Sequence, residues 1–165
     1  ETSTQRVLIF VLRIMLGWVF LWGGFRQVFL TESWSALEFL AGAKTFPDLF
    51  RWLGSPSVVP VISFLVKWGH LLIGLSLVGG LMVRVSSVFG AVLLVLYYLP
   101  RLEFPFVGPG QTNLIVEYHL ILAAALVYLG QIRAGTIWGL DAHVEKLPVV
   151  GPLVRQYPSF RALFA

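Results

Sequence analysis

Five ionisable side chains lie within or beside apolar stretches of the sequence, where a charge is costly unless it has a partner or a function. They are Arg26, Lys67, His70, Glu117 and His119. Histidine and glutamate can exchange protons with a bound molecule, and arginine and lysine stabilise negative charge. We therefore expect the five side chains to form one polar layer near one end of a helical bundle.

This polar layer has three interpretations. In the first, it is a hydrated vestibule in which Glu117 pairs with Lys67 or Arg26 and the histidines are hydrogen-bonded. In the second, it binds a quinone headgroup: His70 and Glu117 transfer protons and contact the carbonyl oxygens, Arg26, Lys67 and His119 hold the site, and an apolar cleft takes the tail. In the third, His70 and His119 are axial ligands of a haem or hold a metal, although two histidines at one depth are not specific for this.

The composition excludes an ordinary soluble globular protein. Of 165 residues, 58% are hydrophobic and 12% are charged, and the mean hydropathy is +0.84. Eight acidic and twelve basic residues cannot supply the polar surface that such a domain needs in water. The basic residues are scattered, which favours anionic lipid headgroups over nucleic acid. The chain has no cysteine, so it cannot supply disulfides, thiolate zinc sites or iron–sulfur ligands.

Four apolar stretches are expected to span the membrane. They occupy about residues 7–29, 58–83, 85–100 and 114–132. The first stretch is too long for a cleaved signal peptide. The connection 31–57 is amphipathic, and Pro47 and Gly54 suit the start and stop of a short helix at the interface. The expected fold is all-α: an integral membrane four-helix bundle over residues 1–141 with a short interfacial segment, followed by a proline-containing cytoplasmic or interfacial tail over 142–165.

The second and fourth stretches are similar to each other without a gap. They read WGHLLIGLSLVGGLMVR at 68–84 and EYHLILAAALVYLGQIR at 117–133. Both have His at the third position and Arg at the last. A duplicated two-helix unit would place His70 and His119 at the same depth.

Small residues predict where the helices approach one another. Gly17 and Gly24 share a face of the first stretch with Arg13, which either extends to the cytoplasmic interface or pairs inside the bundle. The other expected contact positions are Gly69, Ser76 and Gly80 in the second stretch and residues 123–125 in the fourth.

The distribution of lysine and arginine predicts the orientation. Four spans place both ends of the chain on one side, which also carries seven of the twelve basic residues. Both termini are therefore expected in the cytoplasm. An aromatic belt is expected near the opposite interface, formed by Trp22, Trp34, Trp52, Trp68, Tyr97, Tyr98 and Tyr118.

Three segments carry a resemblance to a known family. They read RIMLGWVFLWGGFRQVF at 13–29, GHLLIGLSLVGGLMVR at 69–84, and EYHLILAAALVYLG at 117–130 followed by AGTIWGLD at 134–141. In their order and spacing they resemble the DoxX-like membrane proteins, which include the DoxD-type small subunit of thiosulfate:quinone oxidoreductase. The resemblance implies a four-helix membrane protein in a redox complex that passes electrons to quinone. Family members often have an acid at the position of His70 and Lys near Arg26.

The expected function is that of an integral membrane subunit of a quinone-linked respiratory redox complex in the cell membrane. It would bind partner subunits and offer a quinone site near the outer ends of the second and fourth spans. The alternative is a non-catalytic accessory or assembly subunit of a larger membrane enzyme complex, which the apolar tail favours. Whether the chain itself takes part in catalysis is left open at this stage.

Overall fold

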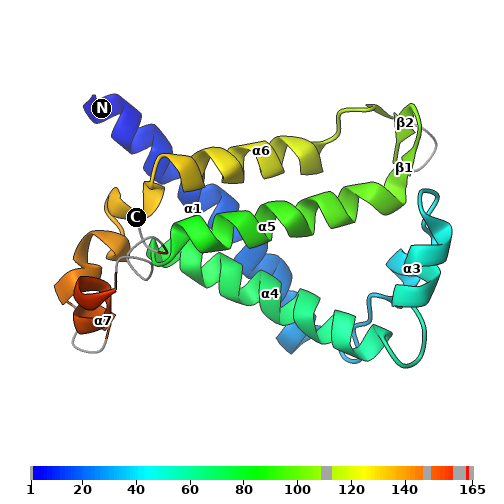
Figure 1. The fold of residues 1–165 in the computed structure, drawn as a ribbon. Helices are drawn as coiled ribbons and strands as arrows, with labels where there is room; N and C mark the ends of the chain where they lie inside the picture. Colours follow the sequence, from blue (N-terminus) through cyan, green and yellow to red (C-terminus); the bar gives the residue numbers. More distant parts are fainter. Residues whose placement is uncertain (1, 109–112, 147–149, 158–162, 164–165) are drawn as a thin grey trace.

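Apolar helices run between the two ends of the molecule in the computed structural model, which describes residues 2–108, 113–146, 150–157 and 163 (Figure 1). The chain is mostly helical. The helices in chain order are α1 (Ser3–Phe25), α2 (Leu37–Ala41), α3 (Pro47–Leu53), α4 (Val59–Gly79), α5 (Val83–Tyr98), α6 (Tyr118–Gln131) and α7 (Val150–Gln156). Short 3-10 or π-helical turns are η1 (Arg26–Leu30), η2 (Leu99–Arg101), η3 (Ala134–Thr136) and η4 (Leu140–Lys146).

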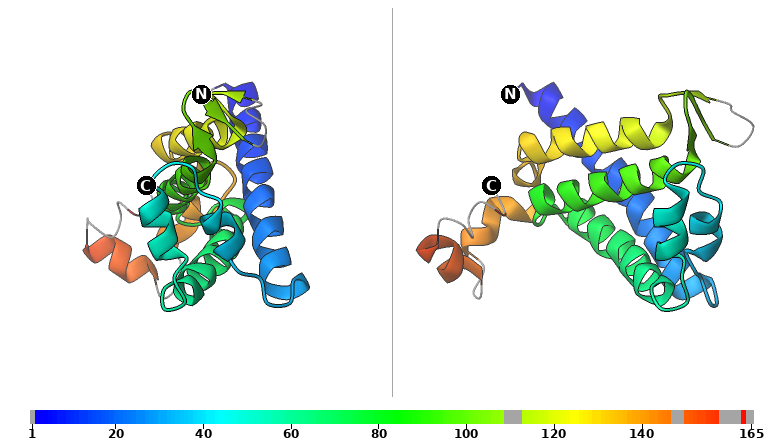
Figure 2. Two further views of the ribbon diagram at one scale, coloured as in Figure 1. Left: turned by 90° about the vertical axis from the view of Figure 1, so that its right-hand side faces the viewer. Right: turned by 45° about the vertical axis from the view of Figure 1, so that its right-hand side comes forward.

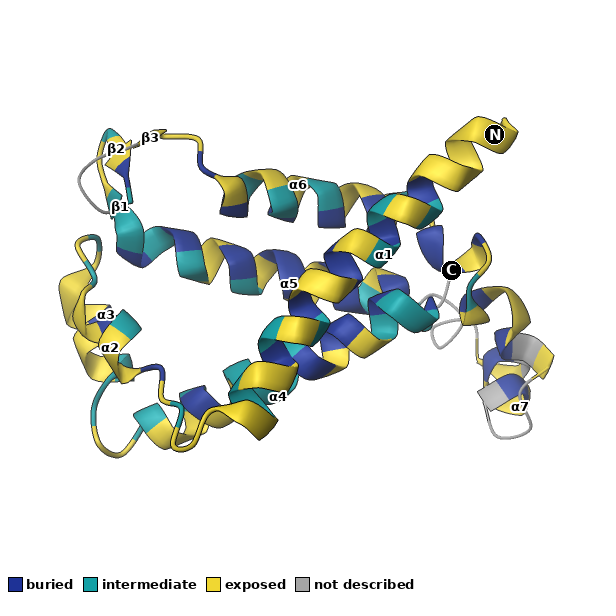
Figure 3. Cartoon of the chain, turned by 180° about the vertical axis from the view of Figure 1, so that it is seen from behind, coloured by how far each residue is buried: buried dark blue, intermediate teal, exposed yellow. Residues whose placement is uncertain are grey.

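Three helical segments are long and apolar enough to cross a membrane: Ser3–Leu30, Val59–Gly79 and Val83–Arg101. Large apolar side chains cover their outward faces, and Figure 3 shows the exposed residues along the outside of α1, α4 and α5. Such faces are stable in contact with lipid, because apolar side chains need no polar partners there. The expectation of a membrane protein agrees with these three helices.

The fourth expected stretch is shorter than predicted. Helix α6 has 14 residues and begins only at Tyr118. Leu114 lies in strand β3 (Asn113–Leu114), and Glu117 has an extended backbone at the N-cap of α6. The predicted start of this helix at residue 114 is therefore wrong. Leu114 pairs with strand β2, and Glu117 caps the helix from outside it.

A small antiparallel sheet was not expected from the sequence. Strands β1 (Leu102–Glu103), β2 (Phe106–Val107) and β3 pair in the order β1-β2-β3. Leu102 pairs with Val107, and Phe106 pairs with Leu114. The sheet joins α5 to α6 at the end of the molecule that also carries α2 and α3 (Figure 1).

Helices α1 and α4 cross at close range because glycines lie at the crossing. A Cβ atom on Gly24 would lie 2.3 Å from the backbone nitrogen of Leu71, and one on Gly74 would lie 2.3 Å from that of Leu21. The predicted role of Gly24 is thus confirmed. The prediction for Gly69 is wrong, since a Cβ atom there would meet nothing within 4 Å.

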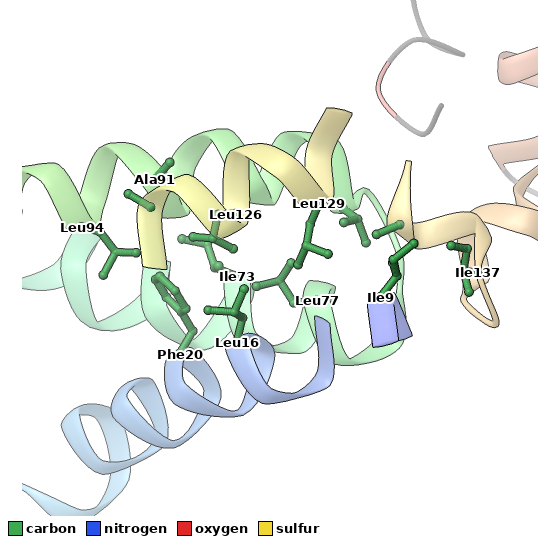
Figure 4. Packing of buried hydrophobic residues seen from close by; sticks show 13 residues of the cluster. Ile9, Leu16, Phe20, Ile73, Leu77, Ala91, Leu94, Leu126, Leu129 and Ile137 are labelled. Carbon is green, nitrogen blue, oxygen red and sulfur yellow. The ribbon is translucent and has the colours of Figure 1, made fainter. Parts of the chain in front are cut away.

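One hydrophobic core lies between α1, α4, α5 and α6 (Figure 4). Phe20 of α1, Leu77 of α4, Leu94 of α5 and Leu126 of α6 are all buried within it. A second, smaller core under α2 and α3 contains Ala36, Leu40 and Phe50. The helices expected at the interface therefore have a core of their own, packed on the start of α4 and the end of α5.

Helices α4 and α5 diverge from the turn that joins them. Gly80 in that turn has φ +67°, a left-handed conformation that favours glycine, and α4 ends before it. Away from the turn the two helices separate, and α2 and α3 lie across the open end (Figures 1 and 2). This divergence leaves the space in which the candidate site lies.

The described part of the tail contains η4 and α7, held together by Val144 and Val154. It lies at the same end of the molecule as the start of α1 (Figure 2). Pro148 and Pro158 lie outside the described residues.

Candidate functional site

Glu117 is a buried carboxylate with three partners. Its Oε2 atom accepts the backbone N–H of His119 at 3.1 Å and the ring Nδ1–H of the same residue at 2.6 Å. Its Oε1 atom lies 3.5 Å from Nη1 of Arg101. The predicted pairing of Glu117 with Lys67 or Arg26 is therefore wrong: Arg101, the last residue of the turn η2 that follows α5, supplies the positive charge.

His70 is half-buried in α4, with its ring directed between α1 and α5. Its Nδ1–H donates to the carbonyl of Val66 at 2.9 Å, one helical turn earlier. Its ring centroid lies 5.6 Å from that of Phe20 and 5.6 Å from that of Tyr97. In the neutral ring this arrangement leaves Nε2 as the acceptor.

Tyr97 connects the two histidines. Its ring lies 5.6 Å from His70 and 6.0 Å from His119, and it is nearly parallel to the latter at 14°. His70 and His119 therefore both lie beside the Tyr97 ring, while the equal depth expected from the internal repeat stays a prediction. The side chain of Gln27 lies near Tyr97, and its buried Oε1 has no hydrogen-bond partner among the described residues.

Sequence reasoning did not select Tyr97, Arg101 or Gln27 for the site. We treated Tyr97 as part of an aromatic belt and Arg101 as the end of a span. Gln27 carried a usable signal, because it is a polar side chain in an apolar span.

Arg26 and Lys67 lie apart from this cluster. Arg26 is exposed in the π-helical turn η1, and Lys67 is half-buried in α4. Among the described residues, neither side chain has a hydrogen bond or ion pair with His70, Glu117 or His119. The structure thus brings together three of the five side chains that we expected to form one layer.

An apolar cavity of about 400 Å³ lies beneath α2 and α3, between the diverging ends of α4 and α5. Its walls include Trp34, Phe39, Phe50, Val66 and Tyr97. Among the side chains that line it, only those of Trp34 and Tyr97 contain a polar atom. Tyr97 thus lines the cavity, and its ring centroid also lies 5.6 Å from that of His70 and 6.0 Å from that of His119.

A second buried polar cluster lies at the opposite end of the molecule. Arg13 is fully buried, and its Nη1 donates to the carbonyls of Ala134 at 2.6 Å and Ile137 at 2.9 Å. Of the two alternatives for this residue, pairing inside the protein is the one observed. Arg13 binds backbone carbonyls and lines no cavity described above. We therefore assign this cluster a role in the stability of the fold.

Asp141 belongs to the same cluster and caps α5. Its carboxylate accepts the backbone N–H groups of Met82 at 2.7 Å and Val83 at 3.2 Å. Burial raises the pKa of Asp141, while these two hydrogen bonds and the charge of Arg13 act in the opposite direction. Gly135 leaves room for the carboxylate, since a Cβ atom there would lie 2.0 Å from Asp141 Oδ2.

Within the described residues, no three His, Asp or Glu side chains form a group that could hold a metal ion.

Comparisons with protein-family models, with curated proteins and with solved structures found no match for this chain.

Proposed function

We propose that this chain is an integral membrane subunit of a quinone-linked respiratory redox complex, with a quinone headgroup site beneath α2 and α3. The observation that supports this most is the apolar cavity whose wall is Tyr97, with two histidines and a buried carboxylate behind that ring. Ligand sites are commonly apolar clefts with a few convergent polar groups. The DoxX-like resemblance of the sequence points to the same function.

A quinone supplies the acceptor chemistry: with two electrons from a donor subunit and two protons, it becomes a quinol. In our proposal the chain's residues handle the protons. His70 and His119 each have Nδ1 engaged, at Val66 and Glu117 respectively, which leaves both Nε2 atoms for proton exchange. Tyr97 lines the cavity beside both histidine rings, and in this proposal its side chain contacts the headgroup.

Glu117 has a distinct part in this proposal. Its carboxylate holds Nδ1–H of His119 and stabilises that ring when it gains a second proton. Arg101 lies 3.5 Å from the carboxylate and balances its negative charge. Glu117 therefore acts as a positioning residue through His119, and Arg26 and Lys67 contribute to the electrostatic field around the site.

We further propose that α6 is a fourth span, so that the chain forms a four-helix bundle with both termini in the cytoplasm. Helix α6 is apolar and packs along α5 in the shared core. On this topology the site lies near the outer surface of the membrane.

The alternative function is an accessory or assembly subunit without a site of its own. Exposed apolar side chains at the sheet favour it: Phe104 is 79% exposed and Leu114 is 62% exposed. A partner subunit would bury such side chains.

Substitution of the site in the assembled complex tests the quinone function. We expect His70→Ala and Glu117→Gln each to lower quinone reduction about 100-fold, as for loss of a general acid–base group, without loss of assembly. His143→Ala and Glu103→Gln are matched controls at exposed positions and should leave turnover unchanged. Unchanged turnover in the first two variants, with assembly intact, would favour the accessory function. A Soret band in the optical spectrum of the isolated chain would favour haem.

A further inference from the structure

An exposed ridge of aromatic side chains runs along α1. Its members are three or four residues apart and therefore share one face of the helix. Successive ring centroids lie 6.4, 6.0 and 5.2 Å apart. The face points away from α4, because Gly17 and Gly24 make the close contact with that helix. This aromatic ridge consists of Trp18, Trp22, Phe25 and Phe29, which are between 40% and 60% exposed.

Trp18 brings an unpaired hydrogen-bond donor to the middle of the expected membrane span. The apolar segment Ser3–Leu30 has 28 residues, and Trp18 lies near its middle with 60% of its surface exposed. Its Nε1–H can only donate, and no acceptor in the described part of the chain binds it. Lipid tails offer no acceptor either, and tryptophan is enriched at the membrane interfaces rather than at this depth. The position therefore favours contact with protein.

A groove of about 450 Å³ between α4 and α5 opens on another side of the bundle. Gly69 lies in its wall, and a Cβ atom there would meet nothing within 4 Å. Ser86 also lines the groove. Its hydroxyl donates to Ser76, whose own hydroxyl donates to the carbonyl of Leu81. The proton of Ser86 is thus engaged, while its oxygen receives no hydrogen bond from the described residues. The groove therefore combines apolar walls with a free acceptor.

The ridge and the groove lie at the same depth. A Cβ atom on Gly17 would lie 3.0 Å from that of Leu77, which places these two residues at one level. Trp18 and Ser76 are their neighbours in the sequence, and Ser76 is hydrogen-bonded to Ser86. Trp18 is therefore level with Ser86 to within about one helical turn, ~5.4 Å. Copies of a membrane protein share one orientation, so the ridge of one copy is level with the groove of its neighbour.

We propose that the aromatic ridge of one copy of this chain packs into the α4–α5 groove of a second copy, with Trp18 Nε1–H donating to Ser86 Oγ. At about 150–250 Å² for a whole aromatic side chain, the half-exposed ridge offers about 400 Å². This is about half of the ~800 Å² per partner that a stable interface buries. The same face continues through residues that are 43–62% exposed, namely Leu8, Val11 and Met15.

Each chain carries both halves of this contact, so identical copies can satisfy one another. A head-to-tail contact repeated around an axis normal to the membrane closes into a ring. Because the ridge and the groove open on different sides of the bundle, two copies cannot form both contacts at once. We therefore expect at least three copies. This assembly goes beyond the proposed function and does not depend on a quinone.

Cysteine cross-linking in native membranes tests the contact, since the chain has no cysteine of its own. Two differently tagged copies are co-expressed, one with Trp22→Cys in the ridge and one with Phe89→Cys in the groove wall, and oxidised with copper phenanthroline. We expect a linked pair that carries both tags, and none from either variant alone. The control replaces Phe89→Cys by Val127→Cys, which is exposed on α6 and should give no pair. It lies at a similar depth, because a Cβ atom on Gly130 would lie 3.1 Å from that of Ser87.

Three cross-linking results would overturn the inference. A pair formed by Trp22→Cys alone would show a symmetric contact between two α1 helices. An equally strong pair with Val127→Cys would show random collision. No pair in any combination would show that neighbouring copies do not meet in this way.

The hydrogen bond gives a second measurement that needs no cysteine. In mild detergent, native mass spectrometry should find at least three copies in one particle. We expect Trp18→Phe and Ser86→Ala each to weaken association about threefold to tenfold, as for the loss of one hydrogen bond between membrane helices. The double variant should be no weaker than the single ones, because both remove the same bond. Trp52→Phe, exposed on α3, is the control and should change nothing. A single copy of the wild type, or additive losses in the double variant, would overturn the inference.

Discussion

Arg13 and Glu117 show how a buried charge is held in this protein: each is bound to backbone groups beside the end of a helix. Arg13 donates to carbonyls that follow α6, and Glu117 accepts an N–H at the start of α6. Asp141 does the same at the start of α5. The N–H groups bound by Glu117 and Asp141 lie at helix starts, where they lack partners within the helix, and the sign of each of these two charges complements the helix dipole.

Replacing Arg13 should strongly destabilise the fold. We expect Arg13→Met to lower the free energy of unfolding by about 3 kcal/mol, because the carbonyls of Ala134 and Ile137 lose their buried donor. Chemical unfolding in detergent micelles measures this. The control is Arg51→Met, which removes only an exposed ion pair with Asp48 and should change stability by about 0.5 kcal/mol or less. Equal losses in the two variants would contradict the role assigned to Arg13.

The pH dependence of stability should report on Asp141. Its pKa is raised in the folded chain, so the folded state binds a proton at pH values where the unfolded carboxyl, with a pKa of about 3.9, has lost it. Stability contributed by this group is complete below that value and is lost as the pH rises through the folded pKa. We expect the unfolding free energy of the wild type, relative to Asp141→Asn, to fall with rising pH in that window. A difference that grows with pH would contradict the direction of the shift.

At the scale of elements, the apolar runs predicted the helices, but not their ends or rotations. Length and hydropathy were enough for α1, α4 and α5, since lipid accepts any apolar side chain. The turn at Gly80 and the start of α5 depend on Asp141, which lies far along the chain.

The parts of the site that could not be predicted depend on helix rotation. Tyr97 reaches both histidines because of how α5 is turned between α4 and α6. A helix surrounded by apolar groups on all sides has no polar face from which that rotation can be predicted. The absence of a polar face also explains the wrong prediction for Gly69. The sequence did not show which face of α4 packs on α1, and Gly74, not Gly69, makes that contact.

The crossing of α1 and α4 can be tested with a pair of glycines. We expect Gly24→Ala to destabilise the protein by about 2 kcal/mol, because the added methyl overlaps the backbone of Leu71. Gly69→Ala is the matched control: nothing obstructs its methyl, and alanine favours the helix by up to about 1 kcal/mol. Thermal unfolding in the same detergent compares them. A loss of stability for Gly69→Ala as large as that for Gly24→Ala would show that the crossing is not the cause.

At the scale of the whole molecule, the helices separate two differently built ends. The start of α1, η4 and α7 lie at one end, and α2, α3 and the sheet lie at the other (Figure 1). The polar cluster of Arg13 and Asp141 belongs to the first end, and the candidate site belongs to the second. The proposed even number of membrane passes would place these two ends on opposite sides of the membrane.

Single cysteines can test this topology, because the chain has none of its own. In intact cells, we expect a membrane-impermeant maleimide to label Lys44→Cys and Glu103→Cys but not Thr2→Cys or Lys146→Cys. Permeabilised cells should give labelling at all four exposed positions, which controls for reactivity. Labelling of Lys146→Cys from outside, on the same side as Glu103→Cys, would show that α6 does not cross.

The short length of α6 has a consequence for how protons reach Glu117 and His119. Fourteen residues give a rod of about 21 Å, roughly 9 Å less than the hydrocarbon thickness that a spanning helix must match. We expect this hydrophobic mismatch to draw the lipid headgroups inward beside α6, since thinning costs only fractions of a kcal/mol per Å. Bulk water would then meet the protein at the level of Arg101 and Glu117, and the candidate site would be supplied with protons without a channel.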